Sequence, residues 1–176
     1  MTLPTTAGRQ ASRSYLLRRR GRKVALTAHI LMAGGWFGVA LVVAICGIVA
    51  SATGDPTLSP ALYRAMETSV WVSIPMGLAA VATGTLLGLG TVFGLVRHWW
   101  VLAKLAIAVA VIVTDAVLVA RVAHDAVISG AAPPALYGST IAHAFLLAVA
   151  TVLSVFKPWG RTARGRRVAE TRRRTV

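Results

Sequence analysis

The chain has 176 residues, of which 56% are hydrophobic and only 14% charged. Charged residues make up about a quarter of a typical soluble domain, and a folded domain of this size cannot hide so much apolar surface from water. The formal net charge of +14 comes mainly from the two ends of the chain, whereas a nucleic-acid-binding domain carries its basic residues on a folded surface. These properties argue against a soluble or nucleic-acid-binding protein and favour one membrane-embedded domain.

The first membrane span is predicted directly after a basic arm. Residues 1–23 end in a run of Arg and Lys, and we expect this arm to be disordered. Residues 24–50 then carry no formal charge. About 20 apolar residues cross a bilayer, so this segment is long enough to span. It is also longer than the hydrophobic region of a signal peptide, about 7–15 residues, so we expect it to be retained.

Three further spans follow at about 68–96, 99–122 and 135–156. A loop containing Gly54, Pro56 and Pro60 precedes the second span, and a loop containing Pro133 and Pro134 precedes the fourth. Residues 24–157 therefore form the predicted transmembrane domain. Residues 158–176 form an Arg-rich tail that we expect to be disordered.

The distribution of basic residues predicts the orientation in the membrane. With the amino terminus in the cytoplasm, the cytoplasmic segments hold 17 Lys and Arg residues and the outer segments hold only Arg64 and Arg121. Positive residues concentrate on the cytoplasmic side of short-looped membrane proteins. We therefore expect a multi-pass protein of the cell membrane with both termini cytoplasmic and anionic lipids near the basic ends. Short loops make successive helices antiparallel neighbours, which predicts an all-α, up-down-up-down bundle of four transmembrane helices.

Small residues recur at four-residue spacing in the first two spans. Small residues let membrane helices approach closely. The pattern predicts packing faces that serve either contacts within the chain or contacts with a homo-oligomer or membrane-complex partner. The residues concerned are Gly34, Gly38, Ala80, Gly84 and Gly88.

Asp115 is the most informative residue, because it lies inside the third span. A carboxylate at this depth costs about 2.5–3.5 kcal/mol, so we expect it to face the bundle and to have a partner. His143 lies at a similar depth on the fourth span, and the two predict a polar layer within the membrane. The alternative is a neutral Asp115 bonded to Thr114, Thr140 or a water.

The four histidines raise the question of a metal or haem. His29 and His98 lie toward one side of the membrane and His124 and His143 toward the other. Neutral imidazole is a common axial haem ligand. No two histidines are four residues apart and Cys46 is the only cysteine, so no compact metal site is predicted. Soluble-enzyme motifs are also absent from the sequence, so no catalytic residue is predicted.

Four segments together resemble a bacterial family of predicted four-span integral membrane proteins, domain of unknown function 2269. They are LMAGGWFG (31–38), ALYRAMETSVW (61–71), GLVRHWWVLAKL (94–105) and TVLSVFKPWGRTARGRR (151–167). The family has no established activity, so the resemblance implies architecture alone.

A looser resemblance runs to protoporphyrinogen-oxidase-like proteins and to copper-resistance membrane domains. Both carry a His followed by a Trp in the first span and a W…KL motif that opens a later span, as His29, Trp36, Trp100, Lys104 and Leu105 do here. This resemblance implies that His29, Lys104 and Trp36 contact haem b or a porphyrin.

Three hypotheses of function follow. The leading one is a non-enzymatic membrane protein that acts as a subunit, scaffold or accessory factor. The second is a haem- or porphyrin-binding membrane redox protein that uses His29. The third is a small proton-coupled transporter in which Asp115 and His143 relay protons.

Overall fold

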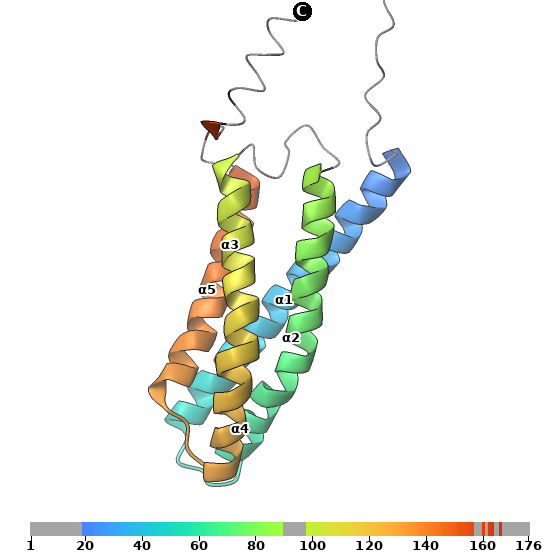
Figure 1. The fold of residues 1–176 in the computed structure, drawn as a ribbon. Helices are drawn as coiled ribbons and strands as arrows, with labels where there is room; N and C mark the ends of the chain where they lie inside the picture. Colours follow the sequence, from blue (N-terminus) through green and yellow to red (C-terminus); the bar gives the residue numbers. More distant parts are fainter. Residues whose placement is uncertain (1–18, 90–97, 157–159, 161, 164–165, 167–176) are drawn as a thin grey trace, which may run out of the picture.

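The computed structural model describes residues 19–89 and 98–156, together with 160, 162, 163 and 166. Six helical elements occur in this part of the chain (Figure 1). They are α1 (Arg19–Ala52), α2 (Leu58–Leu89), α3 (Trp99–Thr114), η1 (Asp115–Val119), α4 (Ala120–Ser129) and α5 (Pro134–Phe156). Elements α3, η1 and α4 follow one another without a break and form one long helix. The predicted all-α class is confirmed.

Four helical segments are long and apolar enough to cross a membrane: α1, α2, the α3–η1–α4 helix and α5. The helices α1 and α3–η1–α4 each pack against both α2 and α5, so the four spans close into a ring of antiparallel neighbours. The connections 53–57 and 130–133 lie at one end of the bundle, which we call the loop end. The opposite end, where α1 begins and α5 ends, is the terminal end (Figure 1).

Helix α2 begins ten residues before the predicted second span because Asp55 caps it. The Asp55 carboxylate accepts hydrogen bonds from the backbone N–H of Thr57 (2.8 Å) and of Leu58 (3.3 Å), and from the Thr57 hydroxyl (2.7 Å). These bonds satisfy donors that a helix start leaves without partners. They also hold the pKa of Asp55 below its ordinary value. Pro60 is tolerated here because the first turn of a helix does not use its N–H groups.

The third spanning helix is longer than predicted and ends at a glycine. It continues past 122 to Ser129, where Gly130 adopts a left-handed conformation with φ of 72°. The Gly130 N–H donates to the Ala126 carbonyl at 3.0 Å, as in a helix C-cap. Pro133 follows in the loop, and Pro134 begins the next helix.

Several sequence predictions concern the ends of the spans and the termini. The basic arm 1–23 lies outside the described residues as far as 18, and residues 19–23 form the first turn of α1. Residues 90–96 of the predicted second span also lie outside the described part. So does most of the tail 158–176.

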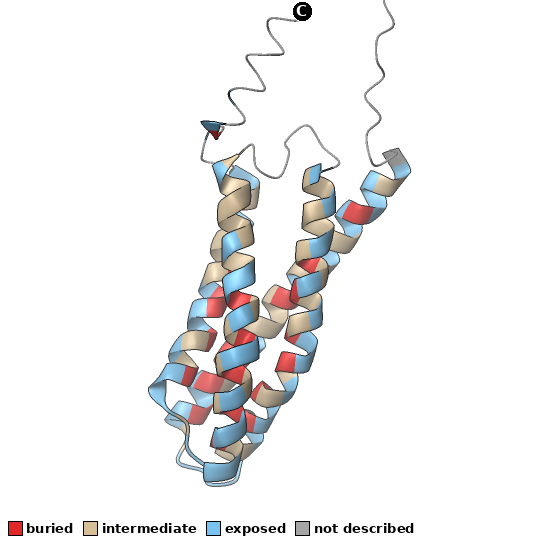
Figure 2. Cartoon of the chain, viewed as in Figure 1, coloured by how far each residue is buried: buried red, intermediate tan, exposed pale blue. Residues whose placement is uncertain are grey.

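The core consists of two apolar clusters. Figure 2 shows the buried residues in red along the bundle. The larger one occupies the loop-end half and includes Met66, Val119 and Leu136, each at most 2% exposed. The smaller one lies toward the terminal end and contains Trp36, Ala80, Val111 and Leu147. Large apolar side chains such as Trp71 (81% exposed) point outward, as expected of a surface that faces lipid.

Candidate functional site at the centre of the bundle

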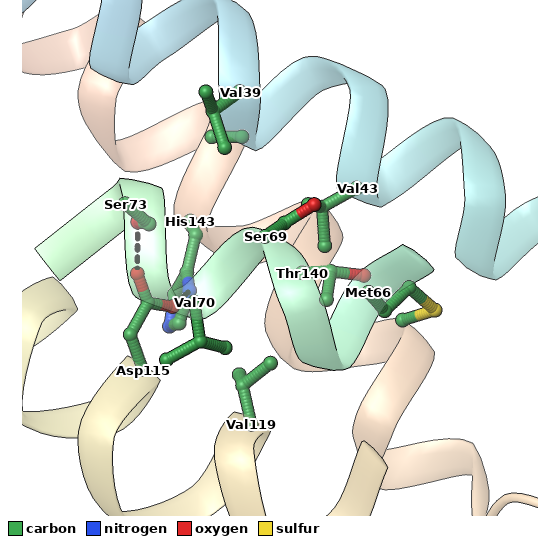
Figure 3. A pocket seen from close by; sticks show the side chains of 11 residues that line it. Val39, Val43, Met66, Ser69, Val70, Ser73, Asp115, Val119, Thr140 and His143 are labelled. Carbon is green, nitrogen blue, oxygen red and sulfur yellow. Dashed lines mark hydrogen bonds and ion pairs between the residues drawn. The ribbon is translucent and has the colours of Figure 1, made fainter. Parts of the chain in front are cut away.

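Four side chains meet between the two apolar clusters, one from each spanning helix. They are Trp36 of α1, Ser73 of α2, Asp115 at the start of η1 and His143 of α5, and we call them the central layer. Each residue is between 3% and 7% exposed. Figure 3 shows three of them, with Ser73, Asp115 and His143 turned toward one another.

Hydrogen bonds join the central layer into one chain. The Trp36 indole N–H donates to Ser73 Oγ at 2.9 Å, and the Ser73 hydroxyl donates to Asp115 Oδ2 at 2.6 Å. His143 Nδ1 lies 2.8 Å from the other carboxyl oxygen, Asp115 Oδ1. An indole nitrogen can only donate, so the single hydroxyl proton of Ser73 is directed to Asp115. Both carboxyl oxygens are therefore engaged, by partners on two different helices.

Ser73 departs from the usual behaviour of serine in a helix. Ser69, one turn away on the same helix, donates to the carbonyl of Ala65 (2.7 Å), four residues earlier in its own helix. Such back-bonding is the common arrangement for Ser and Thr inside helices. Ser73 instead bonds across to Trp36 and Asp115. This single hydroxyl links three of the four spans.

Gly77 allows the Trp36 ring to reach the central layer. A Cβ atom at Gly77 would lie 2.9 Å from Trp36 Cε2 and 3.0 Å from Ile112. The first contact is shorter than real Cβ atoms make, so a larger residue would displace the ring. Because Gly77 has no side chain, the indole packs against α2 one turn nearer the terminal end than Ser73.

A wide turn begins at Asp115 itself. Residues 115–119 form a π-helical turn, η1, inside an otherwise α-helical span. The buried residues Val111, Asp115, Val119 and Ala123 follow one another at intervals of four. In a regular helix of 3.6 residues per turn, each such step overshoots by roughly 40°. The extra residue of the wide turn absorbs this drift and keeps all four on the face toward the core. Such turns are frequent at functional sites.

A small cavity adjoins the Asp115–His143 pair. Its volume is about 20 Å³, and a single water molecule needs at least about 10–15 Å³ and two to four polar partners. Its lining includes the polar side chains of Ser69, Ser73, Asp115, Thr140 and His143 (Figure 3). The remaining lining residues are Val39, Ala40, Val43, Met66, Val70 and Val119.

The chemistry of the pair centres on one exchangeable proton. A carboxylate beside a protonated imidazole and a carboxylic acid beside a neutral imidazole share the same heavy-atom positions. In both states the proton lies between the carboxyl oxygen and the imidazole nitrogen, so the two groups share it.

The contact expected between Asp115 and His143 is therefore present. The alternative partners are engaged elsewhere, because Thr114 donates to the Ala110 carbonyl (2.7 Å) and Thr140 to the Tyr137 carbonyl (2.9 Å). Sequence reasoning missed Ser73 and Trp36 as members of the layer. The role of the pair in function stays a prediction.

The three residues suggested as haem or porphyrin contacts lie in different surroundings. Trp36 belongs to the central layer. His29 lies between α1 and α2, where Nδ1 is 3.0 Å from the Ala80 carbonyl oxygen and 3.1 Å from Thr83 Oγ1. Lys104 lies on α3 with its ammonium 5.8 Å from the centre of the Trp100 ring, a cation–π contact. Binding of haem b stays a prediction, tested by an absorption spectrum of wild type and His29→Ala.

The predicted packing glycines behave differently from one another. A Cβ at Gly84 would lie 3.0 Å from the His29 ring, so Gly84 makes room for the contact of His29 with α2. At Gly34 and Gly38 a Cβ would have no neighbour within 4 Å, so these two are not packing positions within the chain. Their neighbour Gly35 faces α2 instead, against Met76. Four-residue spacing identifies a face but not the direction in which it points, so for Gly34 and Gly38 the alternative of contacts with a partner stays a prediction.

Ala80 is 5% exposed in the smaller apolar cluster, and Gly88 is half-buried near the end of α2. The predicted homo-oligomer or membrane-complex partner stays a prediction.

A second carboxylate–imidazole pair lies near the loop end. Glu67 Oε1 is 2.8 Å from His124 Nδ1, and Glu67 Oε2 is 2.9 Å from Arg64. His124 and Arg64 are largely exposed, with 56% and 62% of their side chains accessible. The pair connects α2 with α4 at the edge of the bundle. Across the part of the chain that the structure describes, no three His, Cys, Asp or Glu side chains are grouped as metal ligands.

Comparison with family models, curated proteins and solved structures found no match to this chain. The resemblance to the four-span family of unknown function therefore stays an expectation.

Proposed function

We propose that this chain is a small helical subunit of the membrane that takes up and releases a proton at the Asp115–His143 pair. The observation that carries the proposal is a carboxyl oxygen 2.8 Å from an imidazole nitrogen, with both residues less than 8% exposed. Ionisable side chains inside a membrane face the bundle interior and mark proton relays and ion pathways. A proton is thus the ligand that suits this site.

The identity of the two groups supports this over a purely structural link between helices. Neutral side chains such as Asn, Gln, Ser or Thr also form hydrogen bonds between membrane helices. Placing a carboxylate at this depth costs about 2.5–3.5 kcal/mol, which those neutral groups avoid. What Asp and His add is the capacity to change charge. The adjoining cavity, about 20 Å³, suits a water or a proton rather than a larger solute.

We further propose that the loop end faces the outside and the terminal end the cytoplasm. The support is the count of basic residues, 17 in the segments at the terminal end against Arg64 and Arg121 toward the loop end. The same basic ends attract anionic lipids of the inner leaflet.

The experiment is a titration of the histidine side chains by nitrogen-15 NMR, with the full chain in lipid nanodiscs. His143 is assigned by the loss of its signals in His143→Gln. We expect the pH dependence of the His143 signals, followed between pH 4 and 9, to change in Asp115→Asn, because the substitution removes the carboxylate that contacts the imidazole.

His124→Gln is the matched control, because it removes a histidine that also contacts a carboxylate but lies at the edge of the bundle. It should leave the His143 midpoint unchanged. A His143 that stays in one protonation state across this range, or that titrates identically in Asp115→Asn, would contradict the proposal.

A further inference from the structure

Hydroxyl groups continue from the Asp115–His143 pair toward the loop end. Ser69 and Thr140 line the same cavity as the pair. Ser69 precedes Ser73 by four residues on α2, and Thr140 precedes His143 by three on α5, so each lies about one turn nearer the loop end. The cavity thus places two hydroxyl residues on the loop-end side of the pair, among apolar neighbours such as Val43 and Val119.

A pair of tyrosines lies farther toward the loop end and reaches the 130–133 connection. Tyr63 of α2 and Tyr137 of α5 are joined through their hydroxyls at 2.8 Å, and the Tyr137 hydroxyl also reaches the Ala132 carbonyl in the 130–133 connection at 3.4 Å. Gly47 of α1 packs against Thr140 and Tyr137. A Cβ there would lie 3.3 Å from Thr140 Oγ1 and 3.4 Å from Tyr137 Cδ1. Thr140 and Tyr137 therefore lie together over one bare stretch of α1.

Among the described residues of the four spans, no buried hydroxyl lies on the terminal-end side of the pair. Toward the terminal end, the next buried side chains after the central layer are Ala80, Val111 and Leu147, which surround the Trp36 ring and are 1–6% exposed. Leu147 and Val111 each lie one turn from a member of the pair, on the same helices. Among the described residues, the polar groups farther along this side include His29 and Thr83, bonded to each other and to the Ala80 carbonyl, as well as Lys104 and Thr151.

The charged and titratable groups around the pair are few. From α1 the pair meets Trp36, Val39, Ala40 and Val43, and from α2 Ser69 and Ser73, none of which carries a charge. Toward the loop end the titratable groups that belong to the larger apolar cluster or pack against it are Cys46, Tyr63 and Tyr137. Toward the terminal end they are His29 and Lys104, beyond the smaller apolar cluster.

We propose that the Asp115–His143 pair exchanges its proton with the aqueous phase at the loop end only, past Thr140 and the Tyr63–Tyr137 pair. This inference rests on the proposed function. Each hydroxyl on the way accepts one proton on its oxygen and releases its own, so no charge stays on it. One proton leaves the water at the loop end and one arrives at the pair. Steps of about one helical turn, about 5.4 Å, are bridged by single waters.

The test uses the full chain in proteoliposomes with the external pH changed rapidly. Time-resolved infrared spectra follow the Asp115 carboxyl band, assigned by its loss in Asp115→Asn. The fraction of molecules with the loop end outward is measured by labelling Ala131→Cys with a membrane-impermeant maleimide. We expect the fast-responding fraction to equal the fraction with the loop end outward.

Variants on the route test its residues. Thr140→Val and the double variant Tyr63→Phe/Tyr137→Phe should slow the fast phase by about ten-fold, because each removes a hydrogen-bonding step. Thr140→Ser should restore the rate. Thr151→Val is the matched control, since Thr151 bonds its own helix at 2.9 Å on the same α5 but toward the terminal end. It should have no effect.

The outcomes separate this inference from the proposed function. If the fast fraction equals the fraction of molecules with the terminal end outward, or if the response does not depend on orientation, access from the loop end is overturned. The pair would still change its protonation in both cases. Unchanged rates in the Thr140 and tyrosine variants overturn the route. A pair that never changes protonation overturns the proposed function and this inference together.

Discussion

The described part of the chain shows two carboxylate–imidazole pairs that have the same separation but opposite surroundings. Asp115–His143 and Glu67–His124 both have an oxygen–nitrogen distance of 2.8 Å and both join neighbouring helices. The side chains of the first pair are 10% and 8% accessible, whereas those of the second are 20% and 56% accessible. Distance alone therefore does not determine what such a pair contributes. Burial determines how much such a pair contributes to stability, because water screens the charges of the exposed pair but does not readily compensate a missing partner in the buried one.

The largest effect should come from removing one partner of the buried pair. His143→Ala leaves Asp115 in the core without its partner, and we expect a loss of roughly 3–5 kcal/mol in the free energy of unfolding. The measurement is reversible unfolding in mixed micelles. The double variant Asp115→Leu/His143→Leu should recover most of the loss because it leaves no unpaired charge. A double variant as unstable as His143→Ala alone would contradict this account.

A smaller loss should follow from disturbing the layer through its packing. Gly77→Val places atoms where the Trp36 ring lies, and overpacking of this kind costs typically 1–3 kcal/mol. Gly34→Ala is the matched control on α1, since a Cβ there meets nothing within 4 Å. Unfolding in the same micelles should separate the two variants. Equal stability of the two would show that the contact between Trp36 and α2 is dispensable.

Substitution in the exposed pair should reduce stability only slightly, by an amount that depends on the salt concentration. Glu67→Gln removes the charge that faces Arg64 and His124, and we expect a small loss of stability that disappears at about 1 M salt, where the screening length is about 3 Å. The same salt titration should leave the loss in His143→Ala unchanged. A salt-independent loss in Glu67→Gln would place this pair in the same class as the buried one.

The smallest effect should appear in acid, at the start of α2. The pKa of Asp55 is lowered in the folded protein because the carboxylate accepts bonds from Thr57 and Leu58. Its stabilising contribution is therefore present above the ordinary pKa of an aspartate and is lost as the pH falls through the lowered value. Asp55→Ala should remove this acid dependence, measured as the difference in unfolding between pH 6 and pH 2. Identical acid dependence in both proteins would exclude a role for the cap.

The sequence predicted the number of spans, and it predicted that Asp115 meets His143. Both predictions rest on depth in the membrane, which hydropathy and helical rise supply directly. Direction around each helix axis is harder, because nearly every face of a membrane helix is apolar. The sequence therefore contained no indication that Trp36 reaches Ser73, or that Gly35 rather than Gly34 faces α2. Ser73 gave no signal, because most serines in helices bond their own carbonyls.

The start of α2 and the wide turn were missed for local reasons. Asp55 was assigned to a loop, although an aspartate followed by a Pro-containing first turn is a recognisable cap. The wide turn at Asp115 leaves a trace only in the four-residue spacing of Val111, Asp115, Val119 and Ala123. That spacing becomes informative once these residues are known to share one face.

The wide turn also gives the third spanning helix a mechanical property. A turn with one surplus residue can move along a helix by exchanging hydrogen bonds one at a time, without any segment leaving the helical state. Each residue that it passes rotates about the axis by roughly 100°. Shifting η1 past Asp115 would swing the carboxyl away from His143 while the ends of the helix stay in place. The span could thus change the direction of the Asp115 side chain without unfolding, and the Asp115–His143 contact opposes that change.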